Sequence, residues 1–205
     1  MRKLLTLLLL AGLLPLGSCD FRRGQLTVET NGDAVTELRI AAGEGDVKAQ
    51  MKLAVMYDTG RGGVGQSYAE AVRWYRKAAE QGLPEAQNNL AVMYKDGQGV
   101  EQDYGEAAHW FLLAAMQGNV LAQSNLGWLY QAGKGVEQDY GEARRWYLMA
   151  ACRGHAAAQN NLGTMYRDGQ GMEQNLDSAR YWLEQAALQG MALAQRNLEK
   201  LEQSR

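Results

Sequence analysis

The chain has 205 residues and a formal net charge of −2 at pH 7. Because basic and acidic residues are nearly balanced and no basic stripe occurs, we expect no nucleic acid partner. The composition therefore argues against a nucleic-acid-binding protein and leaves other classes open.

The N-terminus has the layout of a secretory signal. Arg2 and Lys3 precede a mainly apolar run from Leu4 to Leu16. This run is too short for a convincing membrane span. We therefore predict that residues 1–18 are a signal peptide and not part of the mature fold.

The signal ends in Leu16-Gly17-Ser18-Cys19, which resembles the lipobox of bacterial lipoproteins. The resemblance implies cleavage before Cys19 and lipids on its thiol and new N-terminus; several acyl chains anchor a protein stably. Asp20 resembles the inner-membrane retention signal of enteric bacteria, but that rule varies between bacteria. The expected location is the bacterial cell envelope, facing the periplasm, with inner or outer membrane left open. The alternative is a secreted protein with a chance cysteine.

The next segments are a tether and a cap. Residues 19–33 are mixed, polar and without a period, so we predict a tether. Residues 34–45 look like half of a later repeat, because Ala41-Ala42-Gly43-Glu44-Gly45 matches Ala78-Ala79-Glu80-Gln81-Gly82. A stack of repeats needs a polar end cap, and we assign this half-repeat to that role.

A fixed period governs the chain from residue 46 onward. Tryptophans recur 36 residues apart at Trp74, Trp110, Trp146 and Trp182. Tyrosines recur at 57, 94, 130 and 166, and Ala-Gln pairs begin at 49, 86, 122, 158 and 194. Such a period indicates a stacked-repeat architecture. The predicted units are residues 46–82, 83–118, 119–154 and 155–190, followed by a C-terminal capping helix at 191–205.

Each unit reads as two helices joined by a glycine-rich loop. In the second unit, Pro84 suits the first turn of a helix and Gly97 its end. Asp103 and Glu106 have the spacing of a capping box, in which each side chain accepts from the other residue's backbone N–H. Gly118 follows the second helix. One such hairpin cannot bury its apolar face alone, so we expect the units to stack, with alanines allowing close approach and Trp and Tyr filling the spaces between helices.

The units resemble the Sel1-like repeat family, whose pattern AxxxLGxMY, GxGVxxDY, AxxWY and AAxxG can be read over residues 46–190. The resemblance implies an all-α fold: an α/α solenoid of helix-loop-helix repeats, a right-handed superhelix related to tetratricopeptide repeats, that works as an interaction scaffold. Ala54 and Ala91 stand where the pattern has Gly, and Leu183 replaces its second aromatic residue.

Signals for catalysis are weak. His109 and His155 lie in different units, with no acidic or cysteine partner at metal-ligand spacing. No serine has lysine three residues later, which argues against the Ser-x-x-Lys arrangement of penicillin-binding enzymes. We predict a non-enzymatic protein with no metal and no cofactor, and expect His155 to lie at a helix start.

The first helix of each unit is expected to line the concave face of such a solenoid. Positions opposite the predicted core stripe supply the candidate protein-binding residues Met51, Val55, Asn88, Val92, Trp128, Asn160 and Thr164. Trp is favoured at interface hot spots. The alternative is that the superhelical twist tucks these positions against neighbouring helices. For the asparagines that recur at 89, 125, 161 and 197, a structural role between helices is favoured over contact with a partner.

A second apolar patch is predicted on the second helices. Its members are Leu112, Leu113, Met116, Leu148, Met149 and Cys152, at positions where the first unit has charged residues. We predict a contact there within a homo-oligomer or with a membrane protein. With Cys19 lipidated, Cys152 has no partner for an intrachain disulfide, which separates the chain from the disulfide-stapled branch of the family.

These observations favour a protein–protein interaction scaffold anchored as a lipoprotein in the bacterial envelope. The family resemblance suggests a sharper version, an immunity protein for a periplasmic toxin such as a type VI secreted lipase. The alternative is an envelope enzyme or ligand-binding protein that acts on peptidoglycan or β-lactams.

Overall fold

The computed structural model describes residues 34–203, and this part of the chain contains helices and no strands. A helical segment at residues 34–43 comes first. The helices that follow are α2 (Val47–Thr59), α3 (Tyr68–Glu80), α4 (Pro84–Asp96), α5 (Tyr104–Met116), α6 (Val120–Ala132), α7 (Tyr140–Cys152), α8 (Ala156–Asp168), α9 (Leu176–Leu188) and α10 (Ala192–Gln203). The all-α prediction is confirmed. The predicted signal, Cys19 and the tether lie outside the described residues.

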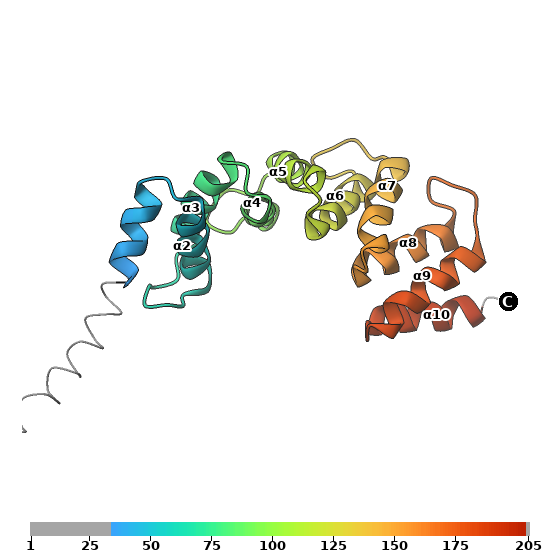
Figure 1. Cartoon of the computed structure of the whole chain (residues 1–205). Coiled ribbons are helices and arrows are strands. Elements are labelled where there is room, and N and C mark those ends of the chain that lie inside the picture. The colour runs from blue at the N-terminus through green and yellow to red at the C-terminus, as the bar shows by residue number, and fades with distance from the viewer. Residues whose placement is uncertain (1–33, 204–205) are drawn as a thin grey trace, which may run out of the picture.

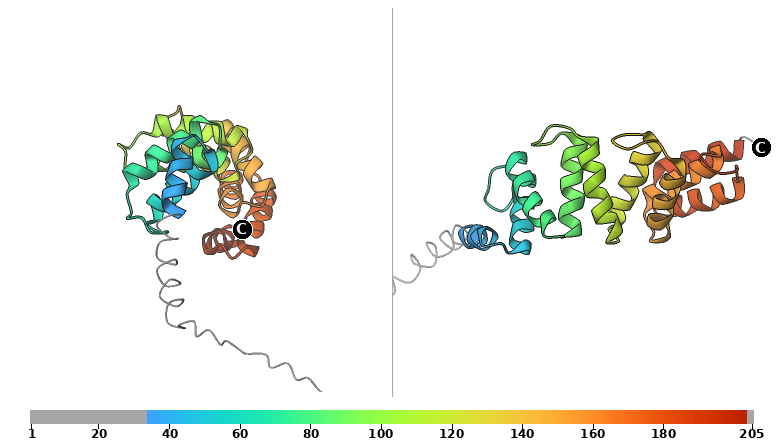
Figure 2. Two further views of the ribbon diagram at one scale, coloured as in Figure 1. Left: turned by 60° about the vertical axis from the view of Figure 1, so that its left-hand side comes forward. Right: turned by 90° about the horizontal axis from the view of Figure 1, so that it is seen from above.

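Consecutive helices pack on one another along the whole series. α2 packs on α3, α4 on α5, α6 on α7 and α8 on α9, and the second helix of each pair packs on the first helix of the next. The pairs form an arch in Figure 1, and the turned views in Figure 2 show the same helices winding round a common axis. α10 packs on α9 at the C-terminal end. The fold is the predicted α/α solenoid.

Polar side chains begin the second helix of each unit, as predicted. Ser67, Asp103, Asp139 and Asn175 each accept from the backbone N–H three residues later. The reciprocal half of the predicted capping box is wrong. The backbone N–H of Asp103 donates to the carbonyl of Tyr94 at 3.0 Å, at the end of the preceding helix. Because that N–H is already used, Glu106 has no donor to reach back to.

Glycines connect each loop to the preceding unit. Gly135 has a φ of 70°, and a Cβ there would lie 2.2 Å from the carbonyl carbon of Tyr104, at the start of α5. Gly99 and Gly171 lie in the same way on the units before them. The recurrent loop glycines therefore serve close approach between units as well as turn formation.

Small residues form the centre of the stack. Fully buried alanines recur along the second helices at 71, 78, 107, 114, 143, 150, 179 and 186. At Gly127 a Cβ would lie 2.9 Å from the Tyr147 ring, so the helices approach closely there. Trp146 is 4% exposed, whereas Trp110 and Trp182 are only partly buried against the core. The repeating tryptophans are therefore not equivalent, contrary to the uniform core role that the sequence suggested.

The Ala-Gln pair of each unit has a structural role that the sequence left unexplained. Gln50, Gln87, Gln123 and Gln159 are buried. Each donates its Nε2 to a carbonyl eight residues earlier, at distances of 3.0 to 3.2 Å, and so joins its own helix to the helix before it.

A second glutamine satisfies the side-chain carbonyl of this buried residue in three units. Gln81 donates to Gln50 at 2.7 Å, Gln117 to Gln87 at 2.8 Å, and Gln189 to Gln159 at 2.7 Å. We call this series of side-chain bonds the glutamine ladder. It replaces water at buried amides, which are costly when unpaired.

Arg153 interrupts the glutamine ladder in the third unit. It stands where the other units have glutamine, and its guanidinium donates to the carbonyl of Gly118 instead. As a result, Oε1 of Gln123 is buried without a hydrogen-bond partner. A buried acceptor in this state costs about 1–3 kcal/mol.

Replacing Arg153 with glutamine is therefore expected to stabilise the protein. Gln81 bonds both Gln50 and the carbonyl of Gly45, so Arg153→Gln can restore the ladder and keep the bond to Gly118. We expect a gain of about 1 kcal/mol and a rise of about 2–4 °C in the melting temperature, measured by circular dichroism. The matched control is Gln117→Arg, which should lower it. An unchanged or lower melting temperature for Arg153→Gln would contradict the assignment.

Candidate protein-binding groove

A groove crosses the first helices of three successive units. It has a volume of about 340 Å³. Its lining residues come from α4, α6, α8 and the turn before α8: Lys95, Leu121, Ser124, Asn125, Trp128, His155, Ala157 and Asn161. We call it the Trp128 groove. First helices thus line a recessed face, where the sequence placed the binding surface.

Trp128 is the predicted binding residue that lies in this groove. Its indole is partly exposed, with the Tyr104 ring 6.3 Å away between centroids. The Lys134 ammonium lies 5.2 Å from the Trp128 ring and 4.8 Å from the Tyr104 ring. Because an aromatic face attracts a cation, Lys134 is held at the edge of the groove.

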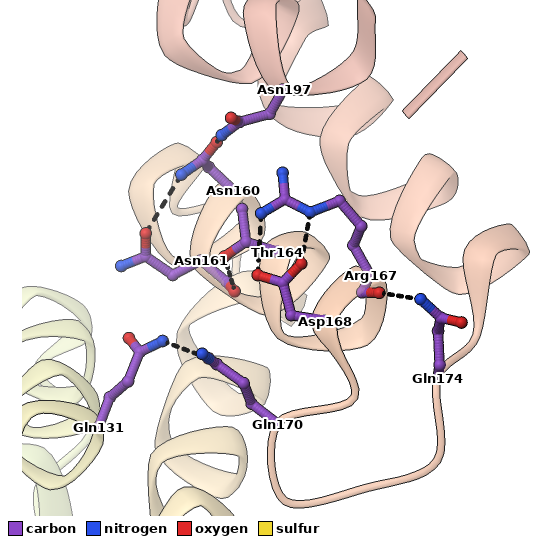
Figure 3. Close-up of polar contacts among 9 residues, drawn as sticks. All are labelled: Gln131, Asn160, Asn161, Thr164, Arg167, Asp168, Gln170, Gln174 and Asn197. Atoms are coloured by element: carbon purple, nitrogen blue, oxygen red, sulfur yellow. Dashed lines mark hydrogen bonds and ion pairs between the residues drawn. The ribbon is translucent and has the colours of Figure 1, made fainter. Parts of the chain in front are cut away.

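Asn88 and Asn160 do not face a partner, and that part of the prediction is wrong. They are 5% and 2% exposed. Asn197 on α10 donates to the Oδ1 of Asn160 at 2.8 Å, and Asn160 donates to Asn161 at 3.2 Å (Figure 3). The superhelical twist places these side chains between neighbouring first helices, which was the alternative that the sequence left open.

The other candidates are dispersed over the first helices. Met51, Val92 and Thr164 are partly buried, and Thr164 bonds its own helix at the carbonyl of Asn161. Val55 is exposed in a separate recess of about 940 Å³ between α2 and the segment at 34–39. These residues therefore do not form one site with Trp128, and their role in binding stays a prediction.

The residue that follows the recurrent tyrosine on each first helix varies with the residue that faces it from the second helix of the same unit. In the first and third units a buried tyrosine donates to a side chain on the first helix: Tyr75 to Asp58 at 3.1 Å and Tyr147 to Gln131 at 2.9 Å. Burial raises the pKa of both tyrosines, and the nearby Asp58 adds to the rise for Tyr75. The hydroxyls therefore stay protonated and act as donors.

The second and fourth units lack that hydroxyl. Phe111 and Leu183 take the tyrosine position, and the first helix carries a cation instead of an acceptor. Lys95 pairs with Asp96 at 3.2 Å, and Arg167 pairs with Asp168 at 2.6 and 2.8 Å (Figure 3). Comparing positions 75, 111, 147 and 183 with 58, 95, 131 and 167 in the sequence would have revealed this pattern.

The second apolar patch is mostly exposed. Met116, Leu148, Met149 and Cys152 are exposed. Leu112 and Leu113 are partly buried, and Leu112 packs on the core, so these two contribute less surface than predicted. The role of the patch as a contact within a homo-oligomer or with a membrane protein stays a prediction.

Two further properties concern residues 34–203. Within that range no helix is long and apolar enough to cross a membrane. No group of three or more His, Cys, Asp or Glu side chains there is placed to hold a metal ion.

A stack of short helix pairs with a recessed aromatic site on its first helices is typical of repeat scaffolds that bind other proteins. Comparison with known families identifies the particular repeat. Residues 47–83, 84–119, 120–155 and 156–191 each match the Sel1 repeat. The chain belongs to the Sel1 repeat family, whose members serve as protein-interaction scaffolds.

Solved structures agree with this assignment. A protective antigen of uropathogenic Escherichia coli with an SLR fold is 44% identical, with a TM-score of 0.76, over 80% of this chain and 35% of that chain. A Sel1 repeat protein from Oxalobacter formigenes is 35% identical, with a TM-score of 0.74, over 83% of this chain and 69% of that chain. The immunity protein Pa5087 from Pseudomonas aeruginosa is 25% identical, with a TM-score of 0.50, over 80% of this chain and 60% of that chain. This chain thus spans about a third of the first relative's length. No match was found among curated proteins.

His155 lines the groove and makes a helix-capping hydrogen bond that depends on pH. Its Nδ1 accepts from the backbone N–H of Ala158 at 3.3 Å and caps α8, as expected for a helix start. Burial lowers the pKa of His155 below its usual 6.5. Protonation removes the acceptor, so the neutral form is required for the cap.

The stability of the protein is therefore expected to fall as the pH falls below about 6.5. The unfolded chain takes up the proton first, because the folded-state pKa of His155 is the lower of the two. In His155→Asn, which copies the cap at Asn119, this loss should be smaller. Urea unfolding at pH 8 and pH 5 measures the difference. The matched control is His109→Asn on α5, which should retain the wild-type dependence; an equal loss in His155→Asn would contradict the role of His155.

Proposed function

We propose that this protein is a non-enzymatic scaffold that captures a protein partner in the Trp128 groove and is held in the bacterial envelope by a lipidated Cys19. The observation that supports capture is a partly exposed indole in a recess built from three units. A rigid recess loses little conformational entropy on binding. Tryptophan in such a place is the residue type that most often dominates binding energy.

The partner that fits best is a periplasmic toxin, which would make the chain an immunity protein. Support comes from the likeness to the immunity protein Pa5087, which shares the fold at 25% identity. The lipobox-like ending at Cys19 supports the location, since a lipid-anchored protein facing the periplasm meets a toxin where that toxin acts. A type VI secreted lipase is the toxin class that we propose.

Capture is tested with the Trp128→Ala variant. Proteins bound by the wild type are recovered from envelope extract, purified and titrated against both forms. We expect the variant to bind about 30-fold more weakly, because hot spots contribute about 2 kcal/mol or more. Cells that produce the captured protein in the periplasm should survive with the wild type and not with the variant. The matched control is Trp182→Ala, which removes a partly buried indole outside the groove. Equal affinities for wild type and Trp128→Ala would refute the groove as the binding site.

Anchoring is tested at Cys19. The wild type should sediment with membranes and incorporate labelled palmitate, whereas Cys19→Ala should do neither. The control is Cys152→Ala, which removes the other cysteine and should sediment and incorporate palmitate as the wild type does. Label in Cys19→Ala, or a wild type found only in the soluble periplasmic fraction, would reject the lipoprotein assignment.

A further inference from the structure

One difference between the repeats removes a structural bond beside the Trp128 groove. Phe111 is fully buried and occupies the place that Tyr75 and Tyr147 hold in other units. Those tyrosines bond Asp58 and Gln131 on the first helix of their own unit. In the second unit, Lys95 takes the position of Asp58 and Gln131. Because Phe111 carries no hydroxyl, Lys95 makes no such bond, and it lines the groove.

The same difference frees Asn125. Its counterparts Asn89 and Asn161 interact with the hydroxyls of Tyr75 and Tyr147. Phe111 offers Asn125 no such partner, and the side chain of Asn125 makes no hydrogen bond with any described residue. Its amide lines the groove unengaged. At two positions that other units use for internal bonds, Lys95 and Asn125 thus line the groove, Asn125 unengaged and Lys95 paired with Asp96.

A related bond is also missing at this boundary. Asn197 donates to Asn160 at 2.8 Å, and the residues two periods earlier in the chain are Asn125 and Asn88. Here the Oδ1 of Asn88 is buried without a partner. Asn125 therefore serves neither of the two internal roles that recurrent asparagines have elsewhere in the stack.

The charged side chains at the groove itself are cations. Lys95 lines it and pairs at 3.2 Å with Asp96, which is not a lining residue. Lys134 borders it on the Trp128 ring, and none of its lining residues is a carboxylate. Lys134 has aromatic partners and no carboxylate partner among the described residues. With Asp96 counted, Lys134 supplies the net positive charge beside the groove, in a protein whose own net charge is −2.

We propose that the Trp128 groove binds an extended acidic segment of the partner protein. One apolar or aromatic side chain of that segment packs on Trp128. A main-chain amide bonds Asn125, and adjacent carboxylates pair with Lys95 and Lys134. This inference rests on the proposed function and adds the chemistry that the groove selects. Since the pairs are partly exposed, binding should weaken with salt.

The experiment uses a phage-displayed library of random 12-residue peptides, selected on the purified protein with its own N-terminal segment. The enriched peptides are synthesised and titrated by fluorescence anisotropy. We expect Asp or Glu next to an aromatic or aliphatic residue, and affinity that falls about tenfold or more in Lys95→Met and in Lys134→Met. The matched control is Lys77→Met, because Lys77 also lies over an indole, Trp74, at 4.4 Å but on α3; it should bind as the wild type.

The outcomes separate this inference from the proposed function. The proposal of an acidic segment would be overturned if the peptides carry no acidic bias, or if they bind Lys95→Met normally. If those peptides still lose binding in Trp128→Ala, the groove remains the binding site. Peptides that bind Trp128→Ala as well as the wild type would overturn both. A library that yields no binder would overturn this inference as well.

A second variant tests the cause. In Phe111→Tyr the new hydroxyl is expected to engage Asn125, as in the neighbouring units, and to weaken binding of the selected peptides several-fold. Phe111→Leu copies Leu183 of the fourth unit and adds no hydroxyl, so it should bind more tightly than Phe111→Tyr. Melting curves confirm that both variants are folded at the assay temperature. Equal binding by the two would show that Asn125 does not contribute.

Discussion

The rest of this structure depends on one constraint, the burial of the alanine-rich contact between neighbouring hairpins. We call this contact the seam; it is formed by the buried alanines of the second helices described above. Each helix pair has a core only because the next pair covers it, and residues such as Ala107 and Ala143 leave room for that contact. Close approach brings backbone carbonyls into the seam, where water cannot reach them. The buried glutamines at 50, 87, 123 and 159 satisfy those carbonyls. Small residues and buried amides are therefore two consequences of one packing requirement, and both must recur with the period.

Departures from the period are informative for the same reason. Where a residue is required by the stack, replacing it leaves a partner without its bond, as Arg153 does to Gln123. Phe111 has a different consequence, because it lacks the buried hydroxyl of Tyr75 and Tyr147, and the residues at the partner positions, Lys95 and Asn125, line a surface groove. A neutral hydrogen bond contributes only about 1 kcal/mol net. A repeat protein with many equivalent bonds tolerates that loss in one unit, and the released side chains line the Trp128 groove.

The sequence predicted the architecture well because the period carries it. The helix pairs, their caps at Asp103 and Asp139, and the exposure of Trp128 in a recess all follow from local patterns. The burial of Asn88 and Asn160 could not be predicted in this way, because a helical face drawn from one unit takes no account of the rotation between units. That rotation moves the next first helix over these side chains. The reciprocal role of Glu106 was wrong for a similar reason. The backbone N–H of Asp103 bonds the Tyr94 carbonyl, nine residues earlier in the chain than Asp103 and outside the capping pattern.

The size of the groove limits what it contributes to recognition. A stable interface involves about 20–30 residues on each partner, far more than the eight residues that line this groove. The groove therefore acts as an anchor, and the remaining contact must spread along the first helices. There the charged pairs Lys95–Asp96 and Arg167–Asp168 lie in the units on either side of Trp128. The Arg167–Asp168 pair is neutral as a whole and so contributes more to discrimination between partners than to affinity. Lys95 instead exchanges Asp96 for a carboxylate of the partner when the partner binds. Specificity then resides in the few side chains that the stack does not use, which allows proteins of one fold to bind different partners.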